Sequence, residues 1–381
     1  MSANSSSFNE PAILFRIQNY NCVSAGALLG ACQVHGVSDI RPLFWKGDSH
    51  IPKDVFSNRV LFIYSFMALH VKSVENEIQT LKKLARQGVD GEGEEIFPWI
   101  TERWLKEKLS LGLITSKRDS VDIDRYPGFH FSTGYLPPIE ITRGCTYCCT
   151  FCAVPRLYGG TIRHRSVAGV VSIVESYLRL KPDRKRIKFL SPNAFAYGSK
   201  DGRTPNFSAL HELLSALKKM GVPEICLGSF PSEVRPDFVT KELLDLVVPF
   251  LSNRVIVMGA QTYNDEKLKE MHRYHDRADV EKAIQLLRKY GFVPHVDFII
   301  GLPGETFEEQ DKLLTFFETL VREYGIRIHL HTFMPLPGTP WERYSPAPIG
   351  ETARRGIQNL SSAKVLDGWW DHQIAYGRGK L

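Results

Sequence analysis

Four of the seven cysteines in this chain lie within eight residues, at positions 145, 148, 149 and 152. Cys145, Cys149 and Cys152 form the pattern C-x3-C-x2-C, and the aromatic Phe151 directly precedes the last of them. A tight loop with this spacing can bring three thiolates to one face, and thiolates are soft ligands that suit iron–sulfur clusters and zinc. Three ligands for a cube of four irons leave one iron open, and an open metal position is a place for chemistry.

Two structural alternatives compete with this interpretation. All four cysteines could bind a structural zinc ion, but the adjacent Cys148 and Cys149 point apart, and zinc ribbons usually separate their cysteine pairs by a dozen or more residues. A disulfide framework is disfavoured because seven is an odd number and the polar start of the chain, residues 1–7, lacks a signal-peptide pattern. Cys148 has no role in the three-cysteine pattern, and we interpret it as a spare thiol.

The stretch from Glu140 to Pro155 resembles the cluster loop of radical S-adenosylmethionine (radical SAM) enzymes, whose signature is C-x3-C-x-φ-C with φ aromatic. The resemblance implies that Cys145, Cys149 and Cys152 bind a [4Fe–4S] cluster whose open iron takes the amino and carboxylate groups of SAM. Reductive cleavage of SAM would then give a 5'-deoxyadenosyl radical. It also implies a reductant such as ferredoxin or flavodoxin as a partner.

Bulk composition sets broad limits. The 381 residues suggest two or three domains, and 43% hydrophobic with 24% charged residues is ordinary for a globular protein. No run of about 18 apolar residues occurs, so we expect no membrane span and a cytoplasmic protein. The net charge of +6 is mild and does not favour nucleic acid as a partner. Basic runs such as Arg163–Arg165 are interpreted as solvated faces.

The order of apolar runs in the N-terminal third predicts an α/β domain of the doubly wound type. Its apolar runs predict strands at 12–17, 40–45 and 59–65 and helices at 23–36 and 71–86. With Gly91-Glu-Gly-Glu-Glu-Ile-Phe-Pro98, this layout resembles the cobalamin-binding-like domain that precedes many radical SAM barrels.

The resemblance is incomplete in this third of the chain. One strand–helix–strand segment is missing between about 88 and 91, and no D-x-H-x-x-G motif is present. The domain is therefore expected to be shortened. Two interpretations stay open, a domain that binds cobalamin and an α/β domain that holds no cofactor.

From residue 138 the pattern becomes strand, loop and helix, repeated about six times. Strands are predicted at 138–142, 186–190, 224–228, 254–258, 295–300 and 327–331. This predicts a partial (β/α)6 barrel, the fold of the radical SAM family, with its site at the carboxyl ends of the strands. We divide the chain into a cobalamin-binding-like domain (1–98), a connector (99–137), the barrel (138–340) and a C-terminal helical extension (341–381).

Polar residues follow the third and fourth strands. Ser229, Glu233 and Arg235 come after the third, where the resemblance implies contacts to the sugar and amino-acid parts of SAM, and Arg235 can pair with a carboxylate. The alternative is a Glu–Arg pair on the surface. Gln261 after the fourth strand begins a stretch similar to Q-S-G…M-x-R of methylthiotransferase-like enzymes. In it, Arg273 could neutralise an anion or close its helix.

The fifth and sixth strand ends carry two further motifs. Residues 297–305 resemble G-x-I-x-G-x-x-G-E, which implies that Gly301, Gly304 and Glu305 lie near the adenine of SAM, although Asp297 replaces the first glycine. The sixth strand carries His329 and His331, which point one way and are candidates for substrate contact or proton transfer, or are two satisfied core histidines.

The whole chain resembles proteins that combine a B12-binding domain with a radical SAM domain, and three functions follow. The first is a radical SAM enzyme, and with cobalamin such an enzyme could transfer a methyl group to an unactivated carbon. The second is a methylthiotransferase acting on tRNA or protein, a group that carries a second cluster on three N-terminal cysteines, where this chain has only Cys22 and Cys32. The third is a non-enzymatic iron–sulfur or zinc protein. The sequence does not identify the substrate.

Overall fold

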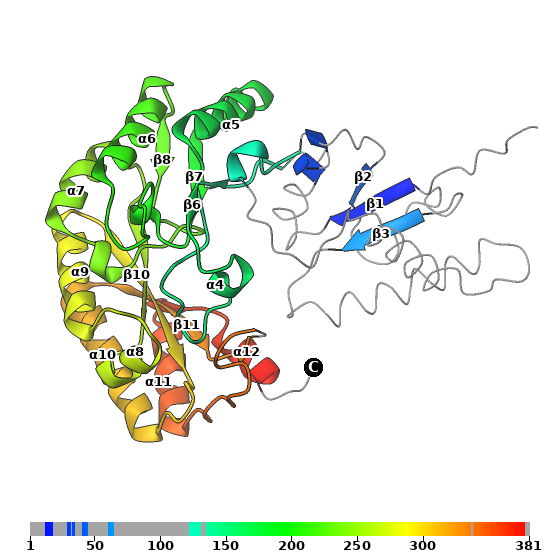
Figure 1. Ribbon diagram of the computed structural model, residues 1–381. Coiled ribbons are helices and arrows are strands. Elements are labelled where there is room, and N and C mark those ends of the chain that lie inside the picture. Colours follow the sequence, from blue (N-terminus) through cyan, green and yellow to red (C-terminus); the bar gives the residue numbers. More distant parts are fainter. Residues whose placement is uncertain are drawn as a thin grey trace, which may run out of the picture. The chain divides into compact units, whose positions relative to one another are not determined.

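The computed structural model divides the chain into two compact units (Figure 1). One comprises Met1–Val121 with Arg125–Pro137, and the other Asp122–Asp124 with Pro138–Leu381. The structure describes residues 12–17, 29–31, 33–34, 40–44, 60–64, 122–130, 135–336 and 338–377. No helix among these residues is both long and apolar enough to cross a bilayer.

Three parallel strands form the sheet of the first unit, β1 (Ala12–Ile17), β2 (Ile40–Phe44) and β3 (Val60–Tyr64). Their order is β2-β1-β3, so the first strand lies in the middle, as in doubly wound folds. Pro42 lacks a backbone N–H, and it lies in β2, at an edge of this described sheet. The three strands predicted from the sequence are therefore confirmed.

Only part of the predicted N-terminal helices can be compared. Residues 29–31 and 33–34 are helical, inside the helix predicted at 23–36. The helix at 71–86, the Gly91–Pro98 motif and the predicted missing segment lie outside the described residues.

Six parallel strands of the second unit follow one another in space as they do in sequence. They are β4 (Ile139–Glu140), β7 (Arg186–Leu190), β8 (Glu224–Cys226), β9 (Val255–Gln261), β10 (Val293–Ile300) and β11 (Arg327–Thr332). An isolated bridge between Val234 and Met258 connects the β4-β7-β8 ladder to the β9-β10-β11 ladder. This arrangement confirms the predicted partial barrel, with each strand within a few residues of its predicted place.

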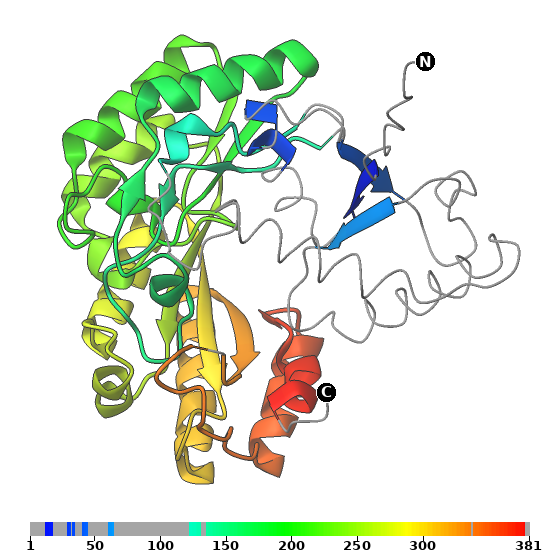
Figure 2. The same cartoon turned by 45° about the vertical axis from the view of Figure 1, so that its right-hand side comes forward.

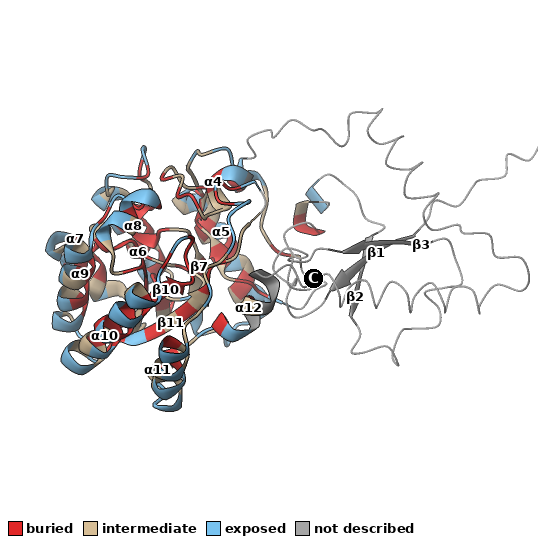
Figure 3. Cartoon of the chain, turned by 90° about the horizontal axis from the view of Figure 1, so that it is seen from below, coloured by how far each residue is buried: buried red, intermediate tan, exposed pale blue. Residues whose placement is uncertain are grey.

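Helices cover the outer face of this sheet (Figure 1). They are α5 (Val167–Leu180), α6 (Phe207–Lys219), α7 (Lys241–Val247), α9 (Arg277–Lys289), α10 (Phe307–Tyr324) and α11 (Glu351–Ser362). In α10, Thr306 and Glu309 form a reciprocal capping box, and Gly325 ends the helix in the left-handed conformation. Apolar residues at helical spacing face the sheet, and polar residues face outward (Figure 3).

Side chains alternate along the strands and decide what lies inside the barrel. Phe298 of β10 stacks on Phe316 and Phe317 of α10, so it faces the helices. Its neighbours Asp297 and Ile299 therefore face the barrel interior, since successive strand residues point to opposite sides. On β11 the same alternation places His329 and His331 on the interior face. The interior of this part of the barrel is consequently polar.

A seventh strand corrects the prediction for the C-terminal segment. Within the predicted helical extension, α11 ends at Ser362, and Lys364 adopts a positive φ of 61°. The chain then turns and forms β12 (Leu366–Asp367), which pairs in parallel with β11. The C-terminal extension thus contributes a strand to the barrel sheet as well as helices.

The last helix, α12 (Trp370–Gly377), contacts the carboxyl end of β11 (Figure 2). The Thr332 N–H donates to Gln373 Oε1 at 2.8 Å, and the Thr332 hydroxyl donates to the Trp370 carbonyl at 2.8 Å. A parallel β12 carries the chain toward the same end as β11.

We predict that Gly368→Ala destabilises the barrel more than Gly291→Ala. Both glycines have positive φ, which costs an alanine about 1–2 kcal/mol. A Cβ on Gly368 would also lie 2.1 Å from the Leu330 carbonyl oxygen, whereas a Cβ on Gly291 meets no atom within 4 Å among the described residues. Thermal unfolding of the full chain measures the difference, and equal losses in Tm would contradict the close approach of β12 to β11.

Candidate metal centre and cofactor site

A two-stranded ladder closes the base of the cysteine loop. Strand β5 (Thr142–Arg143) pairs antiparallel with β6 (Arg163–His164). Gly144 follows β5 with a φ of 86°, and a Cβ there would lie 2.0 Å from the Thr161 carbonyl oxygen. Only glycine fits where the segment after β5 passes so close to the segment before β6. The direction of the chain just before Cys145 is therefore fixed.

The basic run at this base is not a solvated face. The side chain of Arg165 is 3% exposed, and its Nε donates to the Glu140 carbonyl at 3.1 Å. Arg143 forms an ion pair with the carboxylate of Glu140. The interpretation of Arg163–Arg165 as a solvated surface run was wrong, because these residues hold the loop to the first strand.

Three of the four loop thiols lie close together. Burial raises the pKa of the Cys145 thiol, and the nearby charge of Cys149 raises it further. Burial also raises the pKa of Cys152 to about 11, with smaller contributions from Cys149 and Cys145. Such a group of one buried and two half-buried thiols binds a cation well, because a metal centre replaces the protons and offsets the mutual repulsion of the thiolates.

Cys148 is directed elsewhere. Its backbone has a positive φ of 54°, and its Sγ lies 3.7 Å from where a Cβ on Gly160 would be. The thiol therefore faces the backbone of the loop itself. All five cysteines that the structure describes are free thiols, which gives no support to a disulfide framework.

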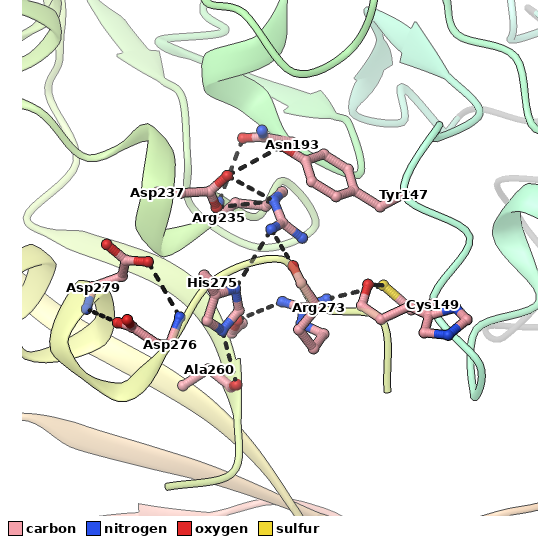
Figure 4. A network of polar contacts seen from close by, with 12 residues as sticks. Tyr147, Cys149, Asn193, Arg235, Asp237, Ala260, Arg273, His275, Asp276 and Asp279 are labelled. Atoms are coloured by element: carbon pink, nitrogen blue, oxygen red, sulfur yellow. Dashed lines mark hydrogen bonds and ion pairs between the residues drawn. The ribbon is translucent and has the colours of Figure 1, made fainter. Parts of the chain in front are cut away.

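Arg273 lies directly behind Cys149 (Figure 4). Its Nη1 donates to Cys149 Sγ at 3.6 Å, and its Nη2 donates to the Gly259 carbonyl at 2.6 Å. The helix α8 (Asp265–Glu270) precedes it, and His272 and Tyr274 on either side have positive φ values of 55° and 56°. These two left-handed residues turn the side chain of Arg273 inward, so the arginine neutralises charge at the loop and does not close its helix.

Arg235 forms the second cation of this site. Its guanidinium carbon lies 3.5 Å from the centroid of the Tyr147 ring, and its Nε lies 2.9 Å from Asp237 Oδ1. Its Nη2 donates to the Arg273 carbonyl at 2.5 Å. The surface Glu–Arg pair considered for Glu233 and Arg235 is wrong, because Arg235 is buried and pairs with Asp237.

His275 completes the polar network as a neutral group (Figure 4). Burial, and then the charges of Arg273 and Arg235, hold the pKa of His275 far below its usual range. Its Nε2 lies 3.3 Å from the Ala260 carbonyl and its Nδ1 lies 3.5 Å from Arg235 Nη2. These partners assign the proton to Nε2 and the acceptor role to Nδ1. The site therefore carries two arginine charges and no histidine charge.

Buried polar atoms without partners gather at the neighbouring strand ends. The isolated bridge between Ser191 and Ser232 joins the loops that follow β7 and β8. Among the described residues, several polar side-chain atoms here are buried and unpaired: Thr150 Oγ1, Ser191 Oγ, Asn193 Nδ2, Ser229 Oγ, Ser232 Oγ and Arg273 Nε. An unpaired buried polar atom costs about 1–3 kcal/mol. Such atoms could be satisfied by a ligand that carries amino, carboxylate or hydroxyl groups.

Two buried carboxyl groups meet on the interior face beside Arg273. Asp297 is the cross-strand partner of Gly259, and a Cβ on Gly259 would lie 3.8 Å from Glu233 Oε2 and 3.3 Å from Arg273 Nη2. Burial raises the pKa of Glu233 and of Asp297, and the charge of Glu233 raises that of Asp297 further. The pair therefore holds protons more tightly than ordinary carboxylates do.

The predicted residues Gln261 and Phe151 also lie at this end of the barrel. Gln261 is buried at the end of β9 with a positive φ of 79°. Phe151 packs against a buried apolar cluster made of Met271, Ile299, Leu302, Phe333 and Trp341. The aromatic residue of the cysteine motif thus joins the loop to the ends of β10 and β11.

The turn after β10 gives its residues different roles. A Cβ on Gly301 would lie 3.0 Å from the Ala347 carbonyl, so this glycine accommodates a crossing segment of the chain itself. A Cβ on Gly304 meets no described atom within 4 Å, which leaves Gly304 free to approach a ligand. Glu305 accepts a hydrogen bond from the Gly301 N–H at 2.6 Å, so its carboxyl group is already used within the turn.

Comparison with known proteins identifies the class. Residues 139–317 match the family model "Radical SAM superfamily". The chain therefore contains a radical SAM domain, and the cofactors of that superfamily are a [4Fe–4S] cluster and SAM. The superfamily recognised from the cysteine loop, and with it these two cofactors, is confirmed.

Particular relatives extend the comparison. The ribosomal protein uS12 methylthiotransferase RimO of Bdellovibrio bacteriovorus is 27% identical over 276 residues, which cover 70% of this chain and 54% of the relative. The tRNA-2-methylthio-N(6)-dimethylallyladenosine synthase of Rickettsia prowazekii is 29% identical over 237 residues, which cover 58% of this chain and 48% of the relative. The chain thus spans about half the length of these curated relatives.

Solved structures show a similar fold over most of the chain. The cobalamin-dependent radical SAM enzyme OxsB with aqua-cobalamin bound has a TM-score of 0.60 at 13% identity, covering 93% of this chain and 57% of that chain. The radical SAM methyltransferase TsrM from Kitasatospora setae, with cobalamin and a [4Fe–4S] cluster bound, has a TM-score of 0.58 at 15% identity, covering 93% and 78%. The predicted fold class, an α/β domain before a radical SAM barrel, is confirmed.

We predict that the free energy of unfolding changes less with pH in the Glu305→Gln variant than in the wild type. Burial raises the pKa of Glu305 to about 7 from an ordinary value of 4.5. Between these values the folded chain keeps a proton that the unfolded chain has lost, so the free energy of unfolding falls as pH rises through this window. The loss has an upper bound of about 3 kcal/mol and is absent in the variant, which cannot ionise.

Thermal unfolding at pH 5 and pH 8 measures this effect. The matched control is Glu308→Gln, because Glu308 is exposed and pairs with Lys312 at 2.8 Å, which lowers its pKa. The difference in Tm between the two pH values should shrink in the Glu305 variant only. An unchanged difference would show that Glu305 titrates as an ordinary carboxyl group.

Proposed function

We propose that Cys145, Cys149 and Cys152 bind a [4Fe–4S] cluster and that the protein uses this cluster to cleave SAM reductively. The observation that carries the proposal is the grouping of these three thiols beside Arg273, while the fourth thiol, Cys148, faces the loop backbone. Three ligands and one open iron are what SAM binding requires. A zinc site of four cysteines would need Cys148 to turn inward.

The residues of the chain supply binding, charge and exclusion of water. Arg273 and Arg235 place two positive charges beside Cys149, which favours an anionic cluster and the carboxylate of SAM. The unpaired hydroxyl and amide groups of Ser229 and Asn193 are suited to the polar parts of SAM. When bound, the cluster supplies the electron that breaks a carbon–sulfur bond of SAM and yields a 5'-deoxyadenosyl radical.

The apolar contacts of the loop protect this chemistry. Phe151 packs on Ile299, Leu302 and Trp341, which keeps water from the side of the loop that faces the barrel. A reactive radical needs such exclusion, because water and stray protons would consume it. A soluble electron donor such as ferredoxin or flavodoxin, in the cytoplasm, is the reductant that fits this proposal.

Cobalamin-dependent methyl transfer is the reaction that we propose for the whole chain. Its support is the similarity in fold to OxsB and TsrM over 93% of the chain, together with the β2-β1-β3 order of the first unit. The substrate would then be a molecule with an unactivated carbon that fits a polar barrel interior.

Methylthiotransfer to tRNA or protein is the second candidate. Its support is the sequence identity of 27–29% to methylthiotransferases. The N-terminal third of this chain has two cysteines, Cys22 and Cys32, and not the three that a second cluster uses in that group. We therefore rank this candidate second.

We predict that the Cys149→Ala variant loses SAM cleavage and that Cys148→Ala retains it. Each variant removes one thiol from the same loop, so Cys148→Ala is a matched control. The proteins are purified and reconstituted without oxygen, reduced with dithionite in the presence of SAM, and assayed for 5'-deoxyadenosine. Loss of one cluster ligand should lower the yield of 5'-deoxyadenosine by at least about 100-fold. Changes to residues that only support metal ligands already lower metal affinity or activity about 10- to 100-fold. Cleavage by the Cys149 variant would refute the ligand set.

We also predict that the reconstituted protein binds about one cobalamin per chain, the stoichiometry of a single cofactor domain. Incubation with hydroxocobalamin, gel filtration and an absorption spectrum measure the bound cofactor. The Cys149→Ala variant should bind as much as the wild type, because Cys149 belongs to the second unit and the cobalamin-binding-like domain to the first. A wild type without a cobalamin band would leave SAM cleavage standing and remove the methyl-transfer proposal.

A further inference from the structure

A second group of metal-ligating side chains lies apart from the cysteine loop, on the interior face of the last three strands. His295 of β10, His329 of β11 and Asp367 of β12 each direct one ligand atom to a common point, and these atoms all lie within 4.8 Å of one another. His295 Nε2 lies 3.1 Å and His329 Nδ1 lies 2.5 Å from the same atom, Asp367 Oδ1. We propose that these three residues form a binding site for a divalent transition-metal ion.

The geometry is near that of a bound ion. Ligand atoms about 2.0–2.1 Å from a tetrahedral zinc lie about 3.3 Å apart. To admit the ion, His329 would shift away from Asp367 Oδ1, and the ligand atoms, which lie within 4.8 Å of one another, would close toward this spacing. The three ligands come from adjacent paired strands, and His329 is the cross-strand partner of Asp367. A barrel sheet holds such positions firmly, which lowers the cost of ordering the ligands.

The surrounding residues orient these ligands. Arg327 Nη2 lies 3.0 Å from Asp367 Oδ2, so the second carboxylate oxygen is held and Oδ1 stays directed at the histidines. The ring of His331 contacts that of His329 edge-on at 4.6 Å between centroids, and its Nδ1 is hydrogen-bonded to Gln373 Nε2 at 3.2 Å. Such outer contacts are typical of metal sites, where they fix the orientation of each ligand.

Access and ligand number suggest the kind of ion. The side chains of His295, His329 and Asp367 are 17%, 27% and 42% exposed, so an ion can enter. Two imidazoles and one carboxylate suit Zn²⁺ or Fe²⁺ and leave at least one coordination position for a further ligand. The proposal does not rest on SAM cleavage, because it uses none of the residues around the cysteine loop.

Zinc binding by the full chain tests the site. The untagged protein is first reconstituted with its cluster, so that iron occupies the loop thiols, and is then dialysed against micromolar Zn²⁺. Elemental analysis counts zinc and iron separately. We expect about one zinc ion per wild-type chain, and a rise in Tm on adding zinc. His329→Ala and Asp367→Asn should lose both effects, whereas His211→Ala, which removes a surface histidine on α6, should keep them.

A milder variant guards against misfolding of the ligand variants. Arg327→Gln removes the outer contact to Asp367 and leaves all three ligands in place, so zinc affinity should fall about 10- to 100-fold without a change in iron content. A wild type that binds no zinc under these conditions overturns the proposal, as does an equal amount of zinc in the His329 and Asp367 variants. Either result leaves the assignment of the cysteine loop untouched.

Discussion

The contact between Arg273 and Cys149 is the interaction on which the site depends. Three thiols held close together repel one another once they ionise, and burial makes that repulsion more costly. Arg273 donates to Cys149 Sγ, and its backbone carbonyl holds Arg235, so one residue brings two positive charges to the loop. The positive charge of a metal centre would offset the negative charge that the two arginines leave on the thiolates.

The barrel makes this contact possible by bringing distant segments together. The cysteine loop follows the first strand, Arg235 follows the third, and Arg273 follows the fourth. Parallel strands all end at the same side of the sheet, so residues more than 120 positions apart in the chain meet there. The loop base adds rigidity, because the β5–β6 ladder and Gly144 fix the direction in which the first cysteine enters.

Much of the fold could be predicted from the sequence, because short-range patterns of apolar and polar residues mark most of its strands and helices. Each barrel strand is an apolar run bounded by polar or turn residues, and each outer helix has apolar residues at helical spacing. Strand β12 escaped prediction because it has only two residues, and a run so short has no periodicity. Asp367 was missed for the same reason, although its pairing with His329 follows at once from the register of β11 and β12.

The site was predicted in part, for reasons that differ from residue to residue. The cysteine spacing predicted three ligands, because a short loop has few ways to present them. The inward direction of Arg273 depends on two left-handed residues, His272 and Tyr274, whose identities give no such signal. The crossing segment at Ala347 gives a further reason for glycine at position 301, one that the motif did not indicate. Contacts of this kind arise from the tertiary structure.

Electron paramagnetic resonance of the reduced protein tests the central claim most directly, because it reports on the open iron itself. If three cysteines bind a [4Fe–4S] cluster with one open iron, dithionite should produce the signal of a reduced cluster, and adding SAM should shift that signal. We expect this shift in the wild type and in the Cys148→Ala variant. An iron-free protein, or a cluster whose signal is the same with and without SAM, would contradict it.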